Sequence, residues 1–224
     1  MLFRSADFSV CGKDEQTAVL QDLLVHVAKG VAQYAWRARQ LGAKDAALDH
    51  YLIEALFTTV TNVNFDPVRV QGIILRGGKM LDQARRLYAS ACVRAGQTPE
   101  SLTGPAQWSP PADVNGLYEQ GEQESIAGRR AKFGPDLAGL QELLVYGLKG
   151  TAAYAHHAKV LGHESDEACA FFEEALDYLT HEPPTVDGLL GFCLRCGEVN
   201  LKVMELLDTA NTSAYGHPDR KSVV

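Results

Sequence analysis

The segment covering residues 20–42 occurs twice in the chain, and this internal match limits the possible folds more than any other feature. Its sequence, LQDLLVHVAKGVAQYAWRARQLG, aligns with LQELLVYGLKGTAAYAHHAKVLG at residues 140–162, at a constant offset of 120 residues. The register continues at residues 54–56, where Glu-Ala-Leu recurs at 174–176. We interpret the match as a tandem duplication. Thirteen of the 23 aligned positions are identical: Leu20, Gln21, Leu23, Leu24, Val25, Lys29, Gly30, Ala32, Tyr34, Ala35, Ala38, Leu41 and Gly42.

Both copies have the periodicity of α-helices. Apolar side chains recur on one face from Leu20 to Leu41, and the second copy repeats this stripe. Gly42 and Gly162 follow the stripes, where a left-handed C-terminal cap is expected. A second helix is expected over roughly 46–62 and 166–180, and a third from about 66 to 94 and from 185 to 210. No sustained period-2 alternation indicates strands.

The sequence therefore predicts an all-α fold, a tandem duplication of a three-helix bundle with a long crossover linker. The predicted bundles cover residues 14–95 and 137–211, and a Pro/Gly-rich linker covers 96–136. Five of the nine prolines lie in this linker, which we expect to cross the surface. A polar helix is compatible with its central part, residues 113–132.

Composition narrows the class of protein. The 28 Asp and Glu residues outnumber the 21 Lys and Arg residues, so the net charge of −7 argues against nucleic-acid binding. The sequence contains neither a run of 18 apolar residues nor a basic, apolar leader, so we expect no membrane association. Five cysteines, an odd number, argue against a secreted disulfide scaffold. These features predict a soluble cytoplasmic protein.

Most candidate sites have a plainer explanation. Cys193 and Cys196 form a Cys-x-x-Cys that could bind a metal or act in redox chemistry, but the pair lies in a predicted helix without a second pair. We favour buried thiols that pack as small apolar groups, and expect the same of Cys92 and Cys169. The side chains of His156 and His157 point about 100° apart on a helix, so they are poorly placed to bind one metal ion together.

Two further motifs are candidates for a binding or catalytic site. The segment Gly77-Gly78-Lys79 lacks the first glycine of a phosphate-binding loop and lies in a predicted helix. Cys11, followed by glycine just before the first helix, offers an accessible thiolate near a positive helix end. A cubane iron–sulfur cluster normally takes four cysteines, so Cys11 alone is one plausible ligand.

Four stretches carry a resemblance to a known family: CGKDEQTAVLQDLL at 11–24, TNVNFD at 61–66, LLVYGLKGTAAYAHHAKVLG at 143–162, and GEVNLKVMELLDTANTSAYGHP at 197–218. In this order they resemble the hybrid cluster protein family, also called the hydroxylamine reductase or prismane family. Nickel carbon monoxide dehydrogenases are more remote relatives of that family, so a fragment of such a relative is the competing identification.

The resemblance implies an N-terminal helical domain of a cytoplasmic oxidoreductase. Family members carry a cubane iron–sulfur cluster and a hybrid iron–sulfur–oxygen cluster, and they reduce hydroxylamine to ammonia and water, with nitric oxide reduction as another proposed role. The resemblance also implies two kinds of partner, an electron-donor redox protein and the C-terminal domains of the same protein.

The chain departs from the family pattern at both ends. The family's first cluster uses four cysteines, and only Cys11 matches one of them, so residues 1–13 read as the remnant of an iron–sulfur loop. Residues 212–224 read as an exit segment toward missing domains that would hold the hybrid cluster. We therefore expect a fragment that completes neither cluster and is inactive alone. Cys193, Cys196 and His217 match no family ligand. The alternative is a stand-alone, non-catalytic helical module that binds a partner.

Overall fold

The computed structural model describes residues 13–217, and the described chain is helical throughout its regular structure, which confirms the all-α prediction. Cys11 and the rest of residues 1–12 and 218–224 lie outside this range. The helices are α1 (Glu15–Gln40), α2 (Ala46–Thr58), α3 (Pro67–Ala95), the short 3₁₀ helix η2 (Gly104–Gln107), α4 (Val114–Gln123), α5 (Ile126–Phe133), α6 (Pro135–Val160), α7 (Asp166–Tyr178) and α8 (Val186–Tyr215).

The long helices begin and end where the local sequence predicts. The Asp14 and Asp66 side chains cap α1 and α3 by accepting hydrogen bonds from the backbone N–H groups of their first turns. Gly42 and Gly162 have φ of +77° and +82°, the left-handed conformation expected after α1 and α6. No helix within residues 13–217 has the length and apolar character needed to cross a membrane.

The helices recur at the spacing of the sequence match. α6 begins and ends 120 residues after α1, and α7 does the same after α2. α8 begins 119 residues after α3. Duplication as the origin of this recurrence stays a prediction.

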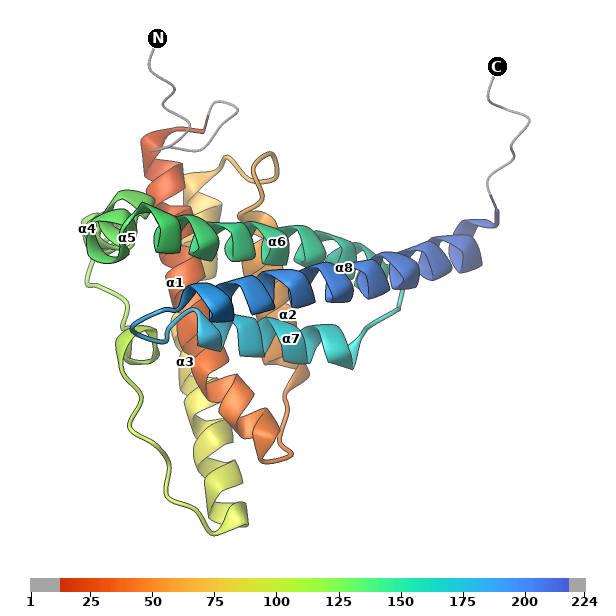
Figure 1. Ribbon diagram of the computed structural model, residues 1–224, viewed down its shortest axis with the longest axis horizontal. Coiled ribbons are helices and arrows are strands. Elements are labelled where there is room, and N and C mark those ends of the chain that lie inside the picture. The colour runs from red at the N-terminus through yellow and green to blue at the C-terminus, as the bar shows by residue number, and fades with distance from the viewer. Residues whose placement is uncertain (1–12, 218–224) are drawn as a thin grey trace.

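The two sets of helices pack across each other. In Figure 1, α1, α2 and α3 run down the view, whereas α6, α7 and α8 run across it. The most extensive pairs are α1 with α3 and α6 with α8, followed by α1 with α7 and α2 with α6. α7 packs more extensively on α1 than on α8, so the two predicted bundles share a large interface.

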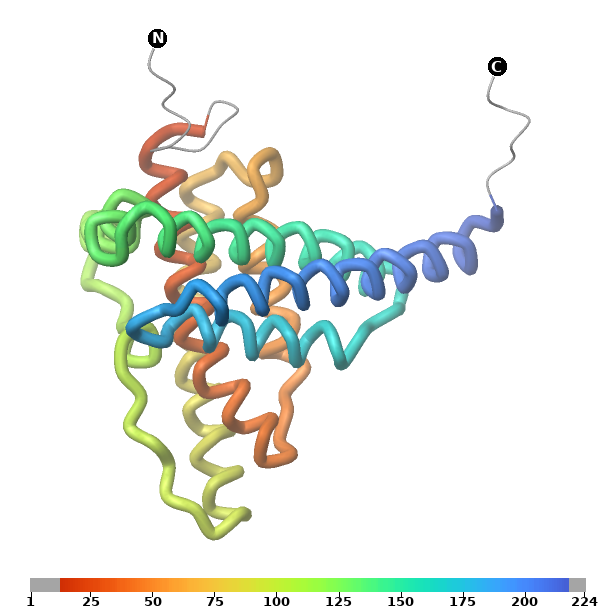
Figure 2. Tube along the Cα trace, viewed as in Figure 1, coloured from red at the N-terminus to blue at the C-terminus, as the bar shows by residue number. Residues whose placement is uncertain are grey.

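The linker lies against the first set of helices. Figure 2 shows residues 96–113 returning along the length of α3 before α4 and α5 lead into α6. Leu102, Ala106 and Leu117 are buried, and η2 and α4 both pack on α1. The central part of the linker is helical, as its composition allowed, and its apolar side chains cover the outer side of α1.

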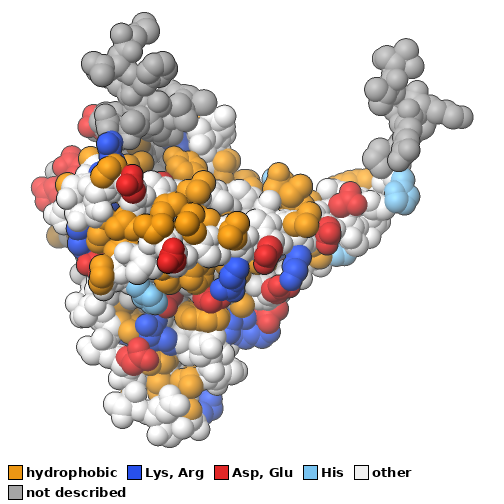
Figure 3. All heavy atoms as spheres, viewed as in Figure 1, with side chains coloured by type: hydrophobic (Ala, Val, Ile, Leu, Met, Phe, Trp, Pro, Cys, Tyr) orange, Lys and Arg blue, Asp and Glu red, His pale blue; other side chains and the backbone are white. Residues whose placement is uncertain are grey.

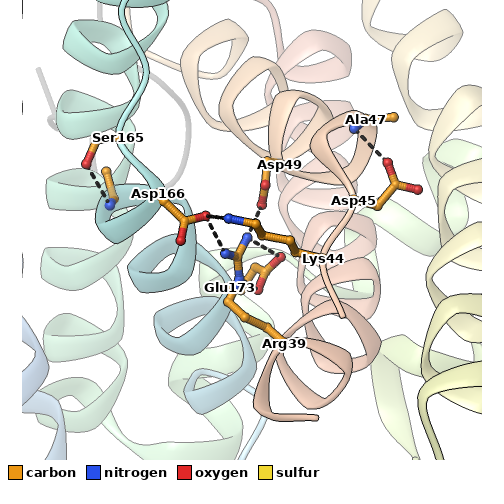
Figure 4. A network of polar contacts seen from close by, with 9 residues as sticks. Arg39, Lys44, Asp45, Ala47, Asp49, Ser165, Asp166 and Glu173 are labelled. Carbon is orange, nitrogen blue, oxygen red and sulfur yellow. Dashed lines mark hydrogen bonds and ion pairs between the residues drawn. The ribbon is translucent and has the colours of Figure 1, made fainter. Parts of the chain in front are cut away.

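Arg39 at the end of α1 joins the two sets of helices (Figure 4). Its guanidinium donates to Asp49 Oδ1 on α2 at 2.7 Å, and to Glu173 Oε2 and Asp166 Oδ1 on α7 at 2.6 and 2.8 Å. Lys44 also reaches Asp166 at 2.8 Å. The Glu173 side chain is only 1% exposed and that of Arg39 10%, so water screens this pair weakly.

Replacing Arg39 tests the network. We expect Arg39→Met to lower the free energy of unfolding by about 3–5 kcal/mol, because it leaves the buried Asp49 and Glu173 carboxylates unpaired. Urea denaturation of the chain measures the loss. The matched control is Lys202→Met, which breaks a solvent-exposed pair with Glu167 and should leave the free energy of unfolding nearly unchanged. Equal losses in the two variants would contradict this role for the Arg39 network.

Candidate functional site

The predicted iron–sulfur ligand Cys11 lies outside the described residues, so its role stays a prediction. Within residues 13–217, no cluster of three or more His, Cys, Asp or Glu side chains is arranged to hold a metal ion. The described chain begins at Lys13, two residues after Cys11. The polar groups around Lys13 are therefore the described surroundings closest in sequence to the predicted ligand.

Lys13 is buried just before the start of α1, where its ammonium group binds two acceptors among the described residues. The Nζ atom donates to Gln21 Oε1 at 2.7 Å and to the Val60 carbonyl at 3.2 Å, and it lies 5.8 Å from the centre of the Phe65 ring. Gln21, eight residues further along the chain, donates through Nε2 to the Asn64 carbonyl at 3.0 Å. These bonds hold the entry into α1 against the turn between α2 and α3.

Asn64, in the stretch TNVNFD, bonds to residues on both sides of the turn between α2 and α3. Its Nδ2 donates to Thr58 Oγ1 at 2.9 Å, and its Oδ1 accepts from the Asp66 backbone N–H at 3.0 Å. Asp66 in turn caps α3. One buried amide thus links the end of α2 to the start of α3. The same residue contacts the Lys13 site, because its carbonyl accepts from Gln21.

A group of charged side chains lies between α1, α5 and α6. Asp22 and Lys29 belong to α1, and Glu142 and Lys149 occupy the positions 120 residues later on α6. Arg129 on α5 donates to Glu142 Oε1 at 2.5 Å. Burial disfavours the charged forms, so it raises the pKa of Asp22 to about 6 and lowers the pKa of Lys29 to about 8. The two repeats place matching acid and base pairs in one poorly hydrated region.

A cavity of about 560 Å³ adjoins this charged group. Lys29, Arg129 and Gln141 line it, together with residues of the linker and of the turn after α7. Gln141 Oε1 is buried and finds no hydrogen-bond partner among residues 13–217. Lys29 forms neither a hydrogen bond nor an ion pair with the described residues, although Asp22, Glu124 and Glu142 influence it electrostatically. The cavity therefore contains unused donors and acceptors.

The Cys-x-x-Cys of α8 lies beside an apolar groove. Cys196 is buried, with Sγ 3.9 Å from Thr151 Oγ1, and Cys193 Sγ lies 4.0 Å from the Leu140 carbonyl. Burial raises the pKa of both thiols, which disfavours the reactive thiolate. Their surroundings are those of packed apolar side chains.

The other sequence candidates take part in packing. His156 and His157 lie on α6 with ring centres 4.8 and 5.4 Å from that of Phe57 on α2. Gly77 lies inside α3, and a Cβ atom there would come within 2.2 Å of the Tyr51 hydroxyl. The small size of Gly77 permits the close approach of α2 and α3. The segment is helical and does not form a phosphate-binding loop.

Sequence reasoning missed the buried polar groups, although a signal was present. Gln21 and Lys29 are among the thirteen positions identical between the copies, and the apolar stripe does not account for them. A polar residue retained in both copies on a largely buried helix needs a partner inside the fold. Nothing in the repeat could identify Lys13 or Asn64, because the second copy has Phe133 and Pro184 at these positions.

Comparison with known proteins identifies similar sequences. The sequence pattern of the Prismane/CO dehydrogenase family matches residues 4–224. The chain is 48% identical to a hydroxylamine reductase of Rhodospirillum rubrum over 96% of its own length and 39% of that protein. It is 46% identical to a hydroxylamine reductase of Acidithiobacillus ferrooxidans and 41% identical to one of Geobacter sulfurreducens, over 38% of each. The chain thus spans about two fifths of the length of these relatives.

The matched glutamines of the two copies provide a stability test. We expect Gln21→Leu to lower the free energy of unfolding by about 2–3 kcal/mol, because it leaves the buried Lys13 ammonium and the Asn64 carbonyl without this partner. Gln141→Leu removes an unpartnered oxygen and should cost less than about 1 kcal/mol. Urea denaturation compares the two, and a larger loss in Gln141→Leu would contradict the assignment.

The raised pKa of Asp22 predicts a pH dependence. Between its ordinary value of 3.8 and about 6 the folded chain binds more protons than the unfolded chain, so this carboxyl lowers stability as the pH rises through that window. Asp22→Asn removes the effect. The difference in free energy of unfolding, variant minus wild type, should therefore increase by about 1–3 kcal/mol between pH 4 and pH 7. Denaturation at both pH values measures this, with the exposed Asp82→Asn as control; parallel profiles for wild type and Asp22→Asn would refute it.

Proposed function

The chain belongs to the Prismane/CO dehydrogenase family, and from this premise we propose that it is the helical domain of a hydroxylamine reductase-like oxidoreductase. The parent protein would combine hydroxylamine with two electrons and two protons to give ammonia and water, with nitric oxide reduction as a second activity. We further propose that the parent is cytoplasmic and takes its electrons from a redox protein. The names of the relatives and their much greater length support this proposal.

The described residues do not fit an iron–sulfur cluster by themselves. A cubane cluster takes four thiolates, whereas the described cysteines are dispersed: Cys92 and Cys169 are buried in different sets of helices, and Cys193 and Cys196 border the α8 groove. We propose that the cluster ligands of the parent lie outside residues 13–217. This part of the chain would then act as a scaffold, and no step of the reaction is assigned to its side chains.

The observation that carries the scaffold role is an uncovered apolar face on α6 and α8, here called the α6–α8 face. Figure 3 shows hydrophobic side chains gathered along these helices. They form one stripe on each helix, and the stripe on α6 borders a groove of about 430 Å³. The exposed members are Leu143, Tyr146 and Tyr154 on α6, and Leu190, Leu194, Leu201 and Met204 on α8.

The first copy shows what covers such a face. Leu23 is fully buried on α1, where linker residues including Trp108 lie beside it, but its counterpart Leu143 is 57% exposed. Gly30 packs so closely under the linker that a Cβ atom would come within 2.3 Å of the Pro105 carbonyl, whereas nothing lies within 4 Å of its counterpart Gly150. Identical residues are thus covered in one copy and open in the other. We propose that a further part of the parent protein covers the α6–α8 face.

The same face supports the second candidate, a stand-alone helical module that binds a separate protein. The two functions differ in one respect. A module would act with its own partner, whereas a domain of the reductase must restore that enzyme's activity when placed in its framework.

A chimera tests the first function. Residues 13–217 would replace the matching segment of the Rhodospirillum rubrum hydroxylamine reductase, and ammonia formation would be measured anaerobically with a reduced dye as electron donor. We expect the chimera to reduce hydroxylamine and the 224-residue chain alone to be inactive. A folded but inactive chimera would favour the separate module, and hydroxylamine reduction by the chain alone would overturn the scaffold role.

Gly150 tests the covered face in the same system. In the chain alone, Gly150→Ala should raise the free energy of unfolding by about 0.5–1 kcal/mol, because the position is open and alanine favours helix. In the chimera the added methyl group should lower activity by obstructing the covering segment. Gly72→Ala, at an equally open helix position on α3, is the matched control and should leave activity unchanged. An unaffected Gly150→Ala chimera would count against close packing at this point.

A further inference from the structure

One buried glutamine has different hydrogen-bond partners in the two copies. In the first copy, the ammonium of Lys13 occupies a site made by Gln21 Oε1 and the Val60 carbonyl, at 2.7 and 3.2 Å. The counterparts of these acceptors are Gln141 and Thr180, each 120 residues later. The turns correspond as well, because Val60 N–H donates to the Phe57 carbonyl at 3.1 Å and Thr180 N–H donates to the Asp177 carbonyl at 2.9 Å.

The second copy has the acceptors without the lysine. Position 133, the counterpart of Lys13, is a phenylalanine. Gln141 is 4% exposed, and its Oε1 has no hydrogen-bond partner among the described residues. Gln141, Thr180 and Phe133 all line the 560 Å³ cavity, so the residues that correspond to the Lys13 site of the first copy border open space in the second.

We propose that this cavity binds a small N–H-donating cation, ammonium or a primary alkylammonium, at Gln141 and Thr180. The ligand would take the place that the Lys13 side chain fills in the first copy. A buried amide oxygen without a donor is costly, and a bound ammonium group removes that cost. The inference rests on the repeat and the cavity, and it is independent of the proposed reductase function.

Charged groups of both signs line the cavity. Its two carboxylates have partners: His26 Nδ1 lies 2.9 Å from Glu124 Oε2, and Lys132 donates to Glu182 at 2.5 Å at the exposed rim. Arg129 is engaged by Glu142. Lys29 is the competing feature, because a cation without an ion pair among the described residues would instead attract an anion. The experiment therefore includes anionic probes.

Thermal unfolding of the 224-residue chain tests the site. At equal ionic strength and pH 7, we expect ammonium and methylammonium chloride at about 100 mM to raise the midpoint by about 2–4 °C relative to sodium chloride. Tetramethylammonium, which has the charge but no N–H group, should have no effect. Equal stabilisation by tetramethylammonium, no stabilisation by either donor, or a larger effect of sodium acetate or phosphate would overturn the proposal.

Two variants locate the effect. Gln141→Leu should abolish the ammonium response, and Gln40→Leu, an exposed glutamine outside this cavity, should retain it. Phe133→Lys should raise the midpoint without ligand and remove the response, because a tethered ammonium then faces the cavity. Phe133→Met controls for loss of the ring and should do neither. A response that survives both Gln141→Leu and Phe133→Lys would place the binding elsewhere and refute the site.

Discussion

The burial of α1 on every side is the constraint on which the rest of the structure depends. This one helix is packed against five other elements, α2, α3, η2, α4 and α7. Its buried residues are therefore distributed around the whole helix. A helix of 26 residues enclosed in this way must place its polar side chains against partners inside the protein. Gln21 bonds to Lys13 and Asn64, and Arg39 bonds to carboxylates on two other helices. The polar contacts thus follow from the position of the helix.

The second copy shows the same helix with part of this enclosure missing. α6 has the length and much of the sequence of α1, but no segment equivalent to the linker covers it in the described chain. Its leucine at position 143 and glycine at position 150 are therefore exposed, although their counterparts are buried. Exposed apolar residues whose counterparts are covered support the proposal that a further segment packs on this face.

Helix positions and helix ends could be predicted with good accuracy from local rules. The Asp66-Pro67 start of α3 and the glycines after α1 and α6 lie where capping preferences place them. The burial of the linker could not be predicted in the same way. Its prolines and glycines indicate a surface crossing, whereas Leu102, Ala106 and Leu117 pack into the core. Sparse apolar residues in an irregular segment have no period from which burial can be inferred.

The sequence by itself determined the helical class, the recurrence at 120 residues and the resemblance to a family, because helix periodicity and repeated residues are encoded locally. Only the tertiary structure decided which repeated residues are covered and which polar groups meet. Gln21 and Gln141 are the same residue in the same register, yet one is bonded by a lysine and the other borders a cavity. That difference arises from segments distant in the chain, and contacts between such segments depend on how the helices cross.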